Sequence, residues 1–140
     1  PAAGNLQNYR VILIKDKISK NEVGKIALNQ CWLSEAPLVL IGVRDDTEVV
    51  KMYPHDGSRY SIQNSAAFIQ NLLTLSHAAG FGACWVEACE DGVLKDYLNI
   101  PQSNQIDAII PIGYPRKVAS QEKQTIQNML YFEKFKNRGR

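Results

Sequence analysis

Residues 61–86 read SIQNSAAFIQNLLTLSHAAGFGACWV, and this stretch contains no Asp, Glu, Lys or Arg. Apolar residues recur in it at helical spacing along two faces: Ile62, Ala66, Ile69 and Leu73 on one, and Phe68, Leu72, Leu75 and Ala79 on the other. A helix that is apolar on most sides is buried or spans a membrane. Amide side chains and His77 interrupt the roughly 20 consecutive apolar residues that a span needs. We therefore expect a buried central helix over residues 61–80, partly covered by a second subunit because the chain is small.

The sequence on both sides of this helix mixes strands and helices, which predicts the α+β class. Short apolar runs predict strands at 10–15, 38–43 and 106–113, the first two buried, with Pro111 marking an edge or a bulge. Helices are expected at 19–33, beginning at Ser19 or Asn21, at 91–98, and from Ser120 to Lys136. Residues 83–86 are expected to be extended, and residues 45–59 to form a polar loop. With 140 residues, the chain fits one domain over 1–140.

Composition excludes several classes of function. Sixteen Lys and Arg against fourteen Asp and Glu leave a net charge of +2, too small and too scattered for a nucleic-acid or membrane surface. Three cysteines without a Cys-x-x-Cys pair, and two histidines far apart in sequence, predict no metal site. The odd cysteine count and the absence of a signal-peptide pattern favour a reducing cytoplasm. A start at Pro1 without Met suggests that an upstream segment is missing.

Motifs for dinucleotide folds, for nucleotide-phosphate loops and for hydrolase nucleophiles are absent, so the residues alone indicate only a soluble α+β domain. Several short motifs do resemble, in order and in approximate spacing, those of the nitroreductase family of FMN-dependent oxidoreductases. They are the loop Pro1-Ala2-Ala3-Gly4-Asn5-Leu6-Gln7, the turn Gly80-Phe81-Gly82-Ala83-Cys84-Trp85, Leu98-Asn99-Ile100-Pro101, and Ile112-Gly113-Tyr114-Pro115.

This resemblance implies a mixed sheet flanked by helices, and a homodimer whose interface contains the central helix. It also implies FMN bound at the subunit interface, where hydride passes from NAD(P)H through flavin N5 to a small acceptor such as a nitroaromatic or a quinone. The arginine-rich N-terminal helix of the family has no counterpart in residues 1–140. The choice between NADH and NADPH and the identity of the acceptor stay open.

The resemblance also suggests which residues would bind the flavin, although none is assigned as catalytic. Asn5 and Gln7 match loop positions near the ribityl chain and the ring, while Asn beside Gly is equally typical of a turn that satisfies its own backbone. Val86 and Glu87 match a segment whose backbone N–H groups point towards flavin N5. Lys123 falls near a phosphate-binding Arg, with Arg116 and Lys117 as nearby substitutes.

Three alternatives remain at this stage. The chain could be a divergent flavoenzyme that reduces enones or removes halogens. It could be a family fold that has lost flavin and serves as a small-molecule binding or regulatory module, a view favoured by Ala2 in place of the usual Ser and by the missing arginines. The matched turns could also reflect only shared α+β geometry.

Overall fold

The computed structural model describes residues 1–116 and 121–137, and its centre is a four-stranded sheet. The strands are β1 (Tyr9–Ile14), β2 (Leu38–Arg44), β3 (Gly82–Ala83) and β4 (Gln105–Gly113), in the order β1-β2-β4-β3. The α+β class is confirmed. The expectation of a mixed sheet is corrected, because every strand pair in the described chain is antiparallel.

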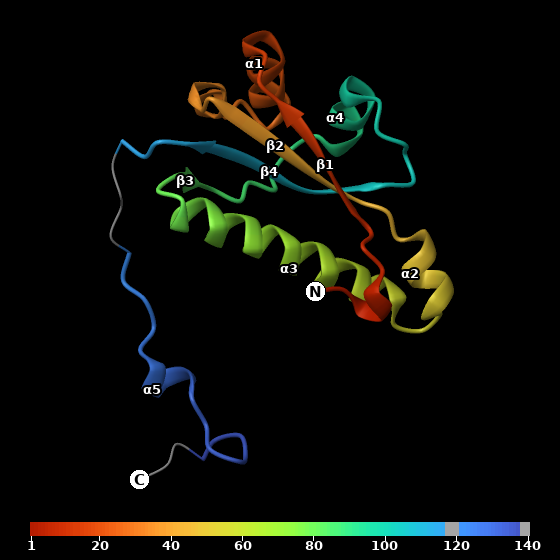
Figure 1. The fold of residues 1–140 in the computed structure, drawn as a ribbon, viewed down its shortest axis with the longest axis vertical. Helices are drawn as coiled ribbons and strands as arrows, with labels where there is room; N and C mark the ends of the chain where they lie inside the picture. The colour runs from red at the N-terminus through yellow and green to blue at the C-terminus, as the bar shows by residue number, and fades with distance from the viewer. Residues whose placement is uncertain (117–120, 138–140) are drawn as a thin grey trace.

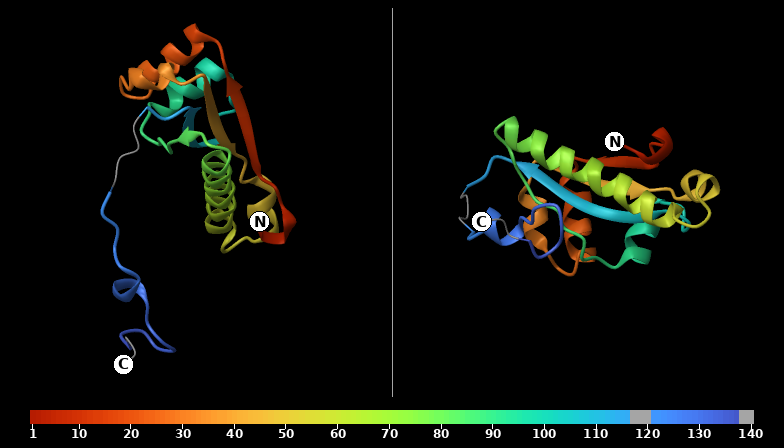
Figure 2. Two further views of the ribbon diagram at one scale, coloured as in Figure 1. Left: turned by 60° about the vertical axis from the view of Figure 1, so that its left-hand side comes forward. Right: turned by 90° about the horizontal axis from the view of Figure 1, so that it is seen from below.

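Helices cover both faces of the sheet (Figure 1, Figure 2). The long helix α3 (Gly57–Ala78) lies along one face, and α1 (Lys17–Ile26) and α4 (Asp91–Leu98) lie on the other. Shorter pieces complete the fold: the 3-10 turns η1 (Ala3–Asn5) and η2 (Cys31–Glu35), and the helices α2 (Thr47–Met52) and α5 (Ile126–Met129).

Strand β2 divides the core into two clusters. All its residues from Val39 to Arg44 are buried, as its continuous apolar sequence predicts for a central strand. Successive side chains of a strand point to opposite faces. Leu40 accordingly packs with Ile69 of α3, while Val39 and Ile41 pack in the larger cluster beneath α1 and α4.

Strand β1 corrects one expectation, because it is an edge strand and not a fully buried one. Val11 and Leu13 are 40% and 57% exposed, on the side that faces away from Ile14 and the larger cluster. The next helix also begins earlier than expected. Asp16, and neither Ser19 nor Asn21, caps α1, since its carboxylate accepts from the backbone N–H of Ser19 at 2.8 Å. Hydrogen bonds from the backbone and the hydroxyl of Ser19 hold the pKa of Asp16 below its ordinary value.

Two other local expectations are wrong. Residues 45–59 contain α2 and the start of α3, where the sequence indicated only a loop. A helix was expected from Ser120, which lies outside the described residues, to Lys136. Within residues 121–137 it is limited to Ile126–Met129, and this segment leads away from the sheet (Figure 1).

Pro111 lies in β4, which is an interior strand, and the register irregularity of the β2–β4 pair falls at Gly42 and Val43 instead. The position is tolerated because strand alternation turns the proline nitrogen towards the β3 side. There the pairing is interrupted between Ala83–Ile112 and the bridge Val86–Ile109.

Helix α3 is buried on one side only. Ser61, Ser65 and Ile69 are at most 2% exposed, whereas Ile62 and Leu75 are 54% and 69% exposed in the isolated chain. The expected helix is therefore confirmed, and its expected burial holds for the face that meets the sheet. No helix in the described residues has the length and apolar character of a membrane span. Residues 1–116 and 121–137 also contain no cluster of potential metal ligands.

Candidate functional site

The N-terminal loop forms a tight, exposed turn around Asn5. Gly4 and Asn5 both have left-handed backbone angles, with φ of 57° and 56°. The turn is closed by hydrogen bonds from the N–H of Asn5 to the carbonyl of Ala2 and from the N–H of Leu6 to that of Ala3, both 3.1 Å. Gln7 Nε2 donates to Asn5 Oδ1 at 2.7 Å and to its carbonyl at 2.8 Å. Asn5 and Gln7 thus satisfy one another and present one polar surface.

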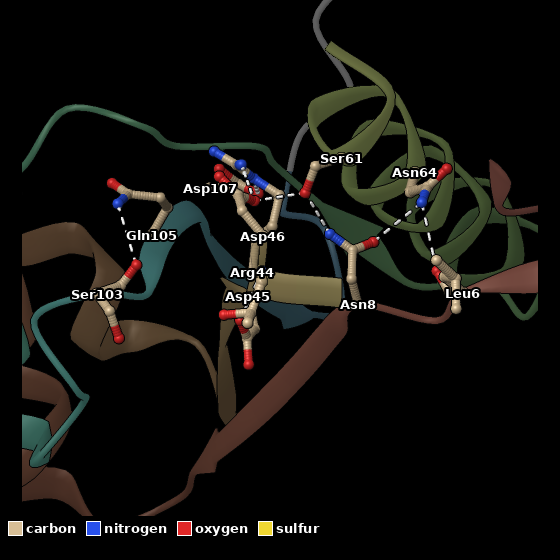
Figure 3. A network of polar contacts seen from close by, with 11 residues as sticks. Leu6, Asn8, Arg44, Asp45, Asp46, Ser61, Asn64, Ser103, Gln105 and Asp107 are labelled. Atoms are coloured by element: carbon tan, nitrogen blue, oxygen red, sulfur yellow. Dashed lines mark hydrogen bonds and ion pairs between the residues drawn. The ribbon is translucent and has the colours of Figure 1, made fainter. Parts of the chain in front are cut away.

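A buried amide network lies directly beneath this turn (Figure 3). Asn64 of α3, 4% exposed, accepts from the N–H of Ala3 at 2.8 Å and donates to the carbonyl of Leu6 at 3.3 Å. Its Nδ2 also donates to Asn8 Oδ1 at 3.1 Å, and Asn8 Nδ2 donates in turn to the hydroxyl of Ser61. The network fixes the turn on the first half of α3.

The network continues to a buried arginine at the end of β2. The hydroxyl of Ser61 donates to Asp46, which also pairs with Arg44, and Arg44 Nε donates to Asp107 Oδ2 at 2.7 Å. The Arg44 side chain is 8% exposed. Burial alone would lower its pKa, but the hydrogen bonds to Asp107 and Asp46 outweigh burial and raise the pKa above its usual value. The guanidinium therefore stays charged and joins β2, β4 and α2 beneath the loop.

Val86 and Glu87 differ in what their backbones offer. The N–H of Val86 donates to the carbonyl of Ile109 at 3.0 Å, and the N–H of Ile109 donates back at 2.7 Å. Val86 is therefore corrected as a candidate donor, because the sheet already uses its amide. Within the part of the chain that the structure describes, the N–H groups of Glu87 and Ala88 meet no acceptor, and both residues are exposed.

The two exposed amides are held between fixed points. On one side Trp85 Nε1 donates to the carbonyl of Asp107 at 2.9 Å, next to the Val86 bridge. On the other side the N–H of Glu90 donates to the carbonyl of Ile26 at 3.1 Å, where α1 ends. The segment between these points forms a short arch that presents backbone donors to a ligand.

Cys89 lies in the same arch but does not supply a reactive group. Burial raises the pKa of its thiol, and the nearby carboxylates of Asp91 and Glu87 raise it further. A thiol with a raised pKa stays protonated at neutral pH and is a weak nucleophile. Cys89 therefore adds no nucleophile to the backbone donors of this arch.

A larger groove lies elsewhere, between η2 and the ends of β3 and β4. It has a volume of about 520 Å³, and its lining includes Trp32, Glu35, Cys84, Tyr114 and Arg116. Arg116 Nη1 lies 3.5 Å from Glu35 Oε2 at the rim. None of Asn5, Gln7, Val86, Glu87 or Lys123 lines this groove.

The predicted phosphate cation is not brought to the other candidates. Lys123 is exposed, lies in no helix or strand, and makes no hydrogen bond or ion pair within the described chain. Lys117 lies outside the described residues. The turn of Asn5 packs on α3, whereas Val86 belongs to the core cluster on the opposite face of the sheet. One chain thus presents two separate groups of candidate residues, the Asn5–Gln7 turn and the arch that contains Glu87 and Ala88.

The short motifs, the antiparallel sheet and the long helix α3 can now be compared with known proteins. The model of the nitroreductase family matches residues 20–114, which include β2, α3 and β4. The chain belongs to the nitroreductase family.

Individual nitroreductase-family relatives are distant in sequence. The NADH dehydrogenase of Thermus thermophilus is 23% identical over 143 residues, which cover 82% of this chain and 70% of that protein. The NADPH:FMN oxidoreductase of Vibrio harveyi, solved with NAD⁺, superposes with a TM-score of 0.83 at 15% identity, over 98% of this chain and 64% of that one. The FMN-dependent nitroreductase of Clostridium difficile R20291 gives 0.79 at 18% identity, over 96% and 80%. These superpositions establish the nitroreductase fold, and the chain spans about two thirds of the Vibrio protein.

Sequence reasoning missed Asn64, Asn8 and the amide of Ala88. Asn64 stands in the uncharged stretch that predicted α3, where a buried amide signals that some backbone group needs a partner. The sequence offers no sign of which group that is. The free amide of Ala88 follows from the register of the Val86 bridge, which only the folded sheet defines.

Proposed function

We propose that this protein is an FMN-dependent oxidoreductase that uses NAD(P)H and reduces a small acceptor such as a nitroaromatic or a quinone. The observation that carries the proposal is the pair of exposed, unpaired backbone amides at Glu87 and Ala88, in a chain that belongs to the nitroreductase family. Two of its structural neighbours are named for FMN.

The donor set fits a flavin. The arch of Glu87 and Ala88 supplies N–H donors for a ring nitrogen, and it is fixed at both ends, so that the donors cost little to organise on binding. The turn of Asn5 and Gln7 supplies amide groups suited to hydroxyls and to ring carbonyls. Lys123 and Arg116 are exposed cations able to meet a phosphate.

When bound, FMN would supply the chemistry of hydride transfer between NAD(P)H and the acceptor. The protein's own residues bind and orient the ring. We assign the amide of Glu87 to hydrogen bonding at flavin N5, and the Asn5–Gln7 turn to contacts with the ribityl chain and the ring. No side chain of this chain is assigned as a general acid or base.

A homodimer would bring the turn of one subunit and the arch of the other together, since one chain presents them on different faces of its sheet. Each would then be a half-site for the flavin. An apolar groove beside α3 supports this assembly. It has a volume of about 480 Å³, lies between α3 and the end of β4, and is lined mainly by apolar side chains, among them Phe68, Leu72, Leu75 and Phe81. A second copy is the occupant that the half-sites require, because the turn of one subunit would then complete the arch of its partner.

The test is a visible absorbance spectrum of the purified protein after addition of FMN and desalting, with light scattering on the same sample. Retained flavin absorbance at a stoichiometry of one per chain, in a dimer, is expected. NAD(P)H should then bleach the bound flavin, and a nitroaromatic or a quinone should restore its colour.

A cofactor-free binding module is the alternative, favoured by the position of Lys123 away from the other candidates. If the protein retained no FMN while circular dichroism showed an intact fold, the result would support that alternative and overturn the proposal of an FMN-dependent enzyme.

A further inference from the structure

We propose that Asn64 is a positioning residue for the flavin, acting through the N-terminal turn that carries Asn5. The inference rests on the proposed function, because it assigns a role in FMN binding. Asn64 itself is buried beneath the turn and does not face a ligand.

The amide of Asn64 holds both ends of one turn. Its oxygen accepts from the N–H of Ala3 at 2.8 Å, where the turn begins. Its nitrogen donates to the carbonyl of Leu6 at 3.3 Å, just after the turn ends. Asn5 lies between these two contacts, so its position follows from the geometry of one side chain.

The turn needs such a support because its sequence allows its shape but does not fix its place on the protein. Gly4 and Asn5 have left-handed angles, which these two residue types adopt readily, so the turn can form by itself. The contacts from Asn64 tie both ends of the turn to α3. Gln7 cannot provide the support, since its side chain is exposed and bonds only to Asn5, which moves with the turn.

The orientation of the Asn64 amide is itself fixed. Its nitrogen also donates to Asn8 Oδ1 at 3.1 Å, and Asn8 uses its own nitrogen on Ser61. Rotating the Asn64 amide by half a turn would set oxygen against oxygen at Leu6 and at Asn8, and nitrogen against nitrogen at Ala3. One amide orientation is therefore selected, and through it one position of Asn5.

Asn64→Asp tests this assignment with an isosteric change. The introduced carboxylate still accepts from Ala3 but loses both donors, and it repels the oxygens of Leu6 and Asn8. FMN affinity, measured by flavin fluorescence at pH 8 and well below the melting temperature, should fall at least about tenfold, the effect of roughly 1.4 kcal/mol. Backbone amide exchange at Leu6, followed without FMN, should accelerate.

Lowering the pH distinguishes positioning from general damage. A buried carboxyl without a cation is protonated more easily than a free one, and its protonated form again offers one donor. The ratio of variant to wild-type FMN affinity should therefore rise towards one as the pH falls from 8 to about 5. Taking the ratio cancels the titration of the FMN phosphate.

Gln63→Glu is the matched control, one residue earlier on α3. The side chain of Gln63 is exposed and makes no hydrogen bond within the described chain, so the same exchange of amide for acid should leave the FMN ratio at one at every pH. Asn64→Ser is the second variant in case the isosteric one does not fold. Its hydroxyl is too short to reach both ends of the turn, and it should weaken FMN binding without the rescue in acid.

Two results would overturn the assignment: Asn64→Asp binding FMN as tightly as the wild type at pH 8, or Leu6 exchange unchanged in the variant. Loss of FMN affinity that does not recover in acid would reduce Asn64 to an ordinary structural residue. If the wild type itself retains no FMN, the proposed function fails together with the flavin role of Asn64. The Leu6 exchange would then decide separately whether Asn64 holds the turn.

Discussion

Replacing Gly57 by Ala should destabilise the protein, although alanine is the better helix former. Gly57 is the first residue of α3, and a Cβ there would lie 2.5 Å from the Cα of Val50 and 2.8 Å from the carbonyl oxygen of Val49. Both are backbone atoms of α2, so the clash can be relieved only by moving one helix. Forcing a methyl group into such a contact costs about 1–3 kcal/mol. The helical preference for Ala over Gly returns at most about 1 kcal/mol. We expect a net loss of up to about 2 kcal/mol in the free energy of unfolding.

Gly92→Ala is the matched control. Gly92 lies in the first turn of α4, and a Cβ there would meet no atom within 4 Å. The same substitution should therefore leave stability unchanged or raise it by up to about 1 kcal/mol. Urea unfolding followed by far-ultraviolet circular dichroism measures both variants. Equal effects of the two substitutions would refute the argument that backbone contact between α2 and α3 decides the sign.

Three further substitutions test the ion network, the first helix cap and the apolar face of α3. Arg44→Met leaves two carboxylates without their cation and should lower the free energy of unfolding in urea by about 3 kcal/mol. Arg59→Met removes an exposed ion pair and should lower it by less than about 1 kcal/mol. Similar losses in the two variants would contradict the importance of the buried network. The pKa of Asp16 is lowered in the folded protein, so its contribution to stability is present above pH 3.8 and is lost as the pH falls below that value. In thermal melts at acid pH the wild type should therefore lose stability relative to Asp16→Asn. If the stabilities of the two proteins fell in parallel with pH, the result would count against the cap. Leu75→Glu should convert the proposed dimer to a monomer in light scattering, whereas Ile18→Glu, at an exposed position on α1, should leave the dimer intact. A dimer that survives Leu75→Glu would argue against α3 as the interface.

The sequence predicted those elements whose pattern and local chemistry agree. The helix at 91–98 has the bounds of α4, because its first turn carries the acidic Asp91 and Asn99 ends it in the left-handed conformation. Strand β2 followed from an uninterrupted apolar run. Helix α2 did not, because its six residues carry little pattern of their own, and so short a helix is stable only through packing against α3.

The sequence predicted the parts of the candidate site that depend on neighbouring residues. It could not predict the parts that depend on how distant strand segments pair. An Asn beside a Gly predicted a turn at Asn5, and the structure has a turn there, in which Gln7 Nε2 also donates to Asn5 Oδ1. Val86 was wrong as a donor because its amide is used by a bridge to Ile109, a residue 23 positions away that no local pattern links to it. The prediction of a long helix at the end of the chain was wrong for a similar reason. The apolar residues there have no surface in the isolated chain against which a helix could form.

Helix α3 shows why the uncharged stretch carries so much information. Its buried face combines Ile69 with the polar residues Ser61, Asn64 and Ser65, while Ile62 and Leu75 are exposed. Polar groups inside a helix are retained when they satisfy buried partners, and Asn64 does so for the backbone of the turn. Apolar residues outside require a second surface, and in the proposed dimer that surface is another copy of the same helix. One helix would then set both the position of Asn5 and the distance to the partner's arch, so that flavin binding and dimer formation depend on the same 22 residues.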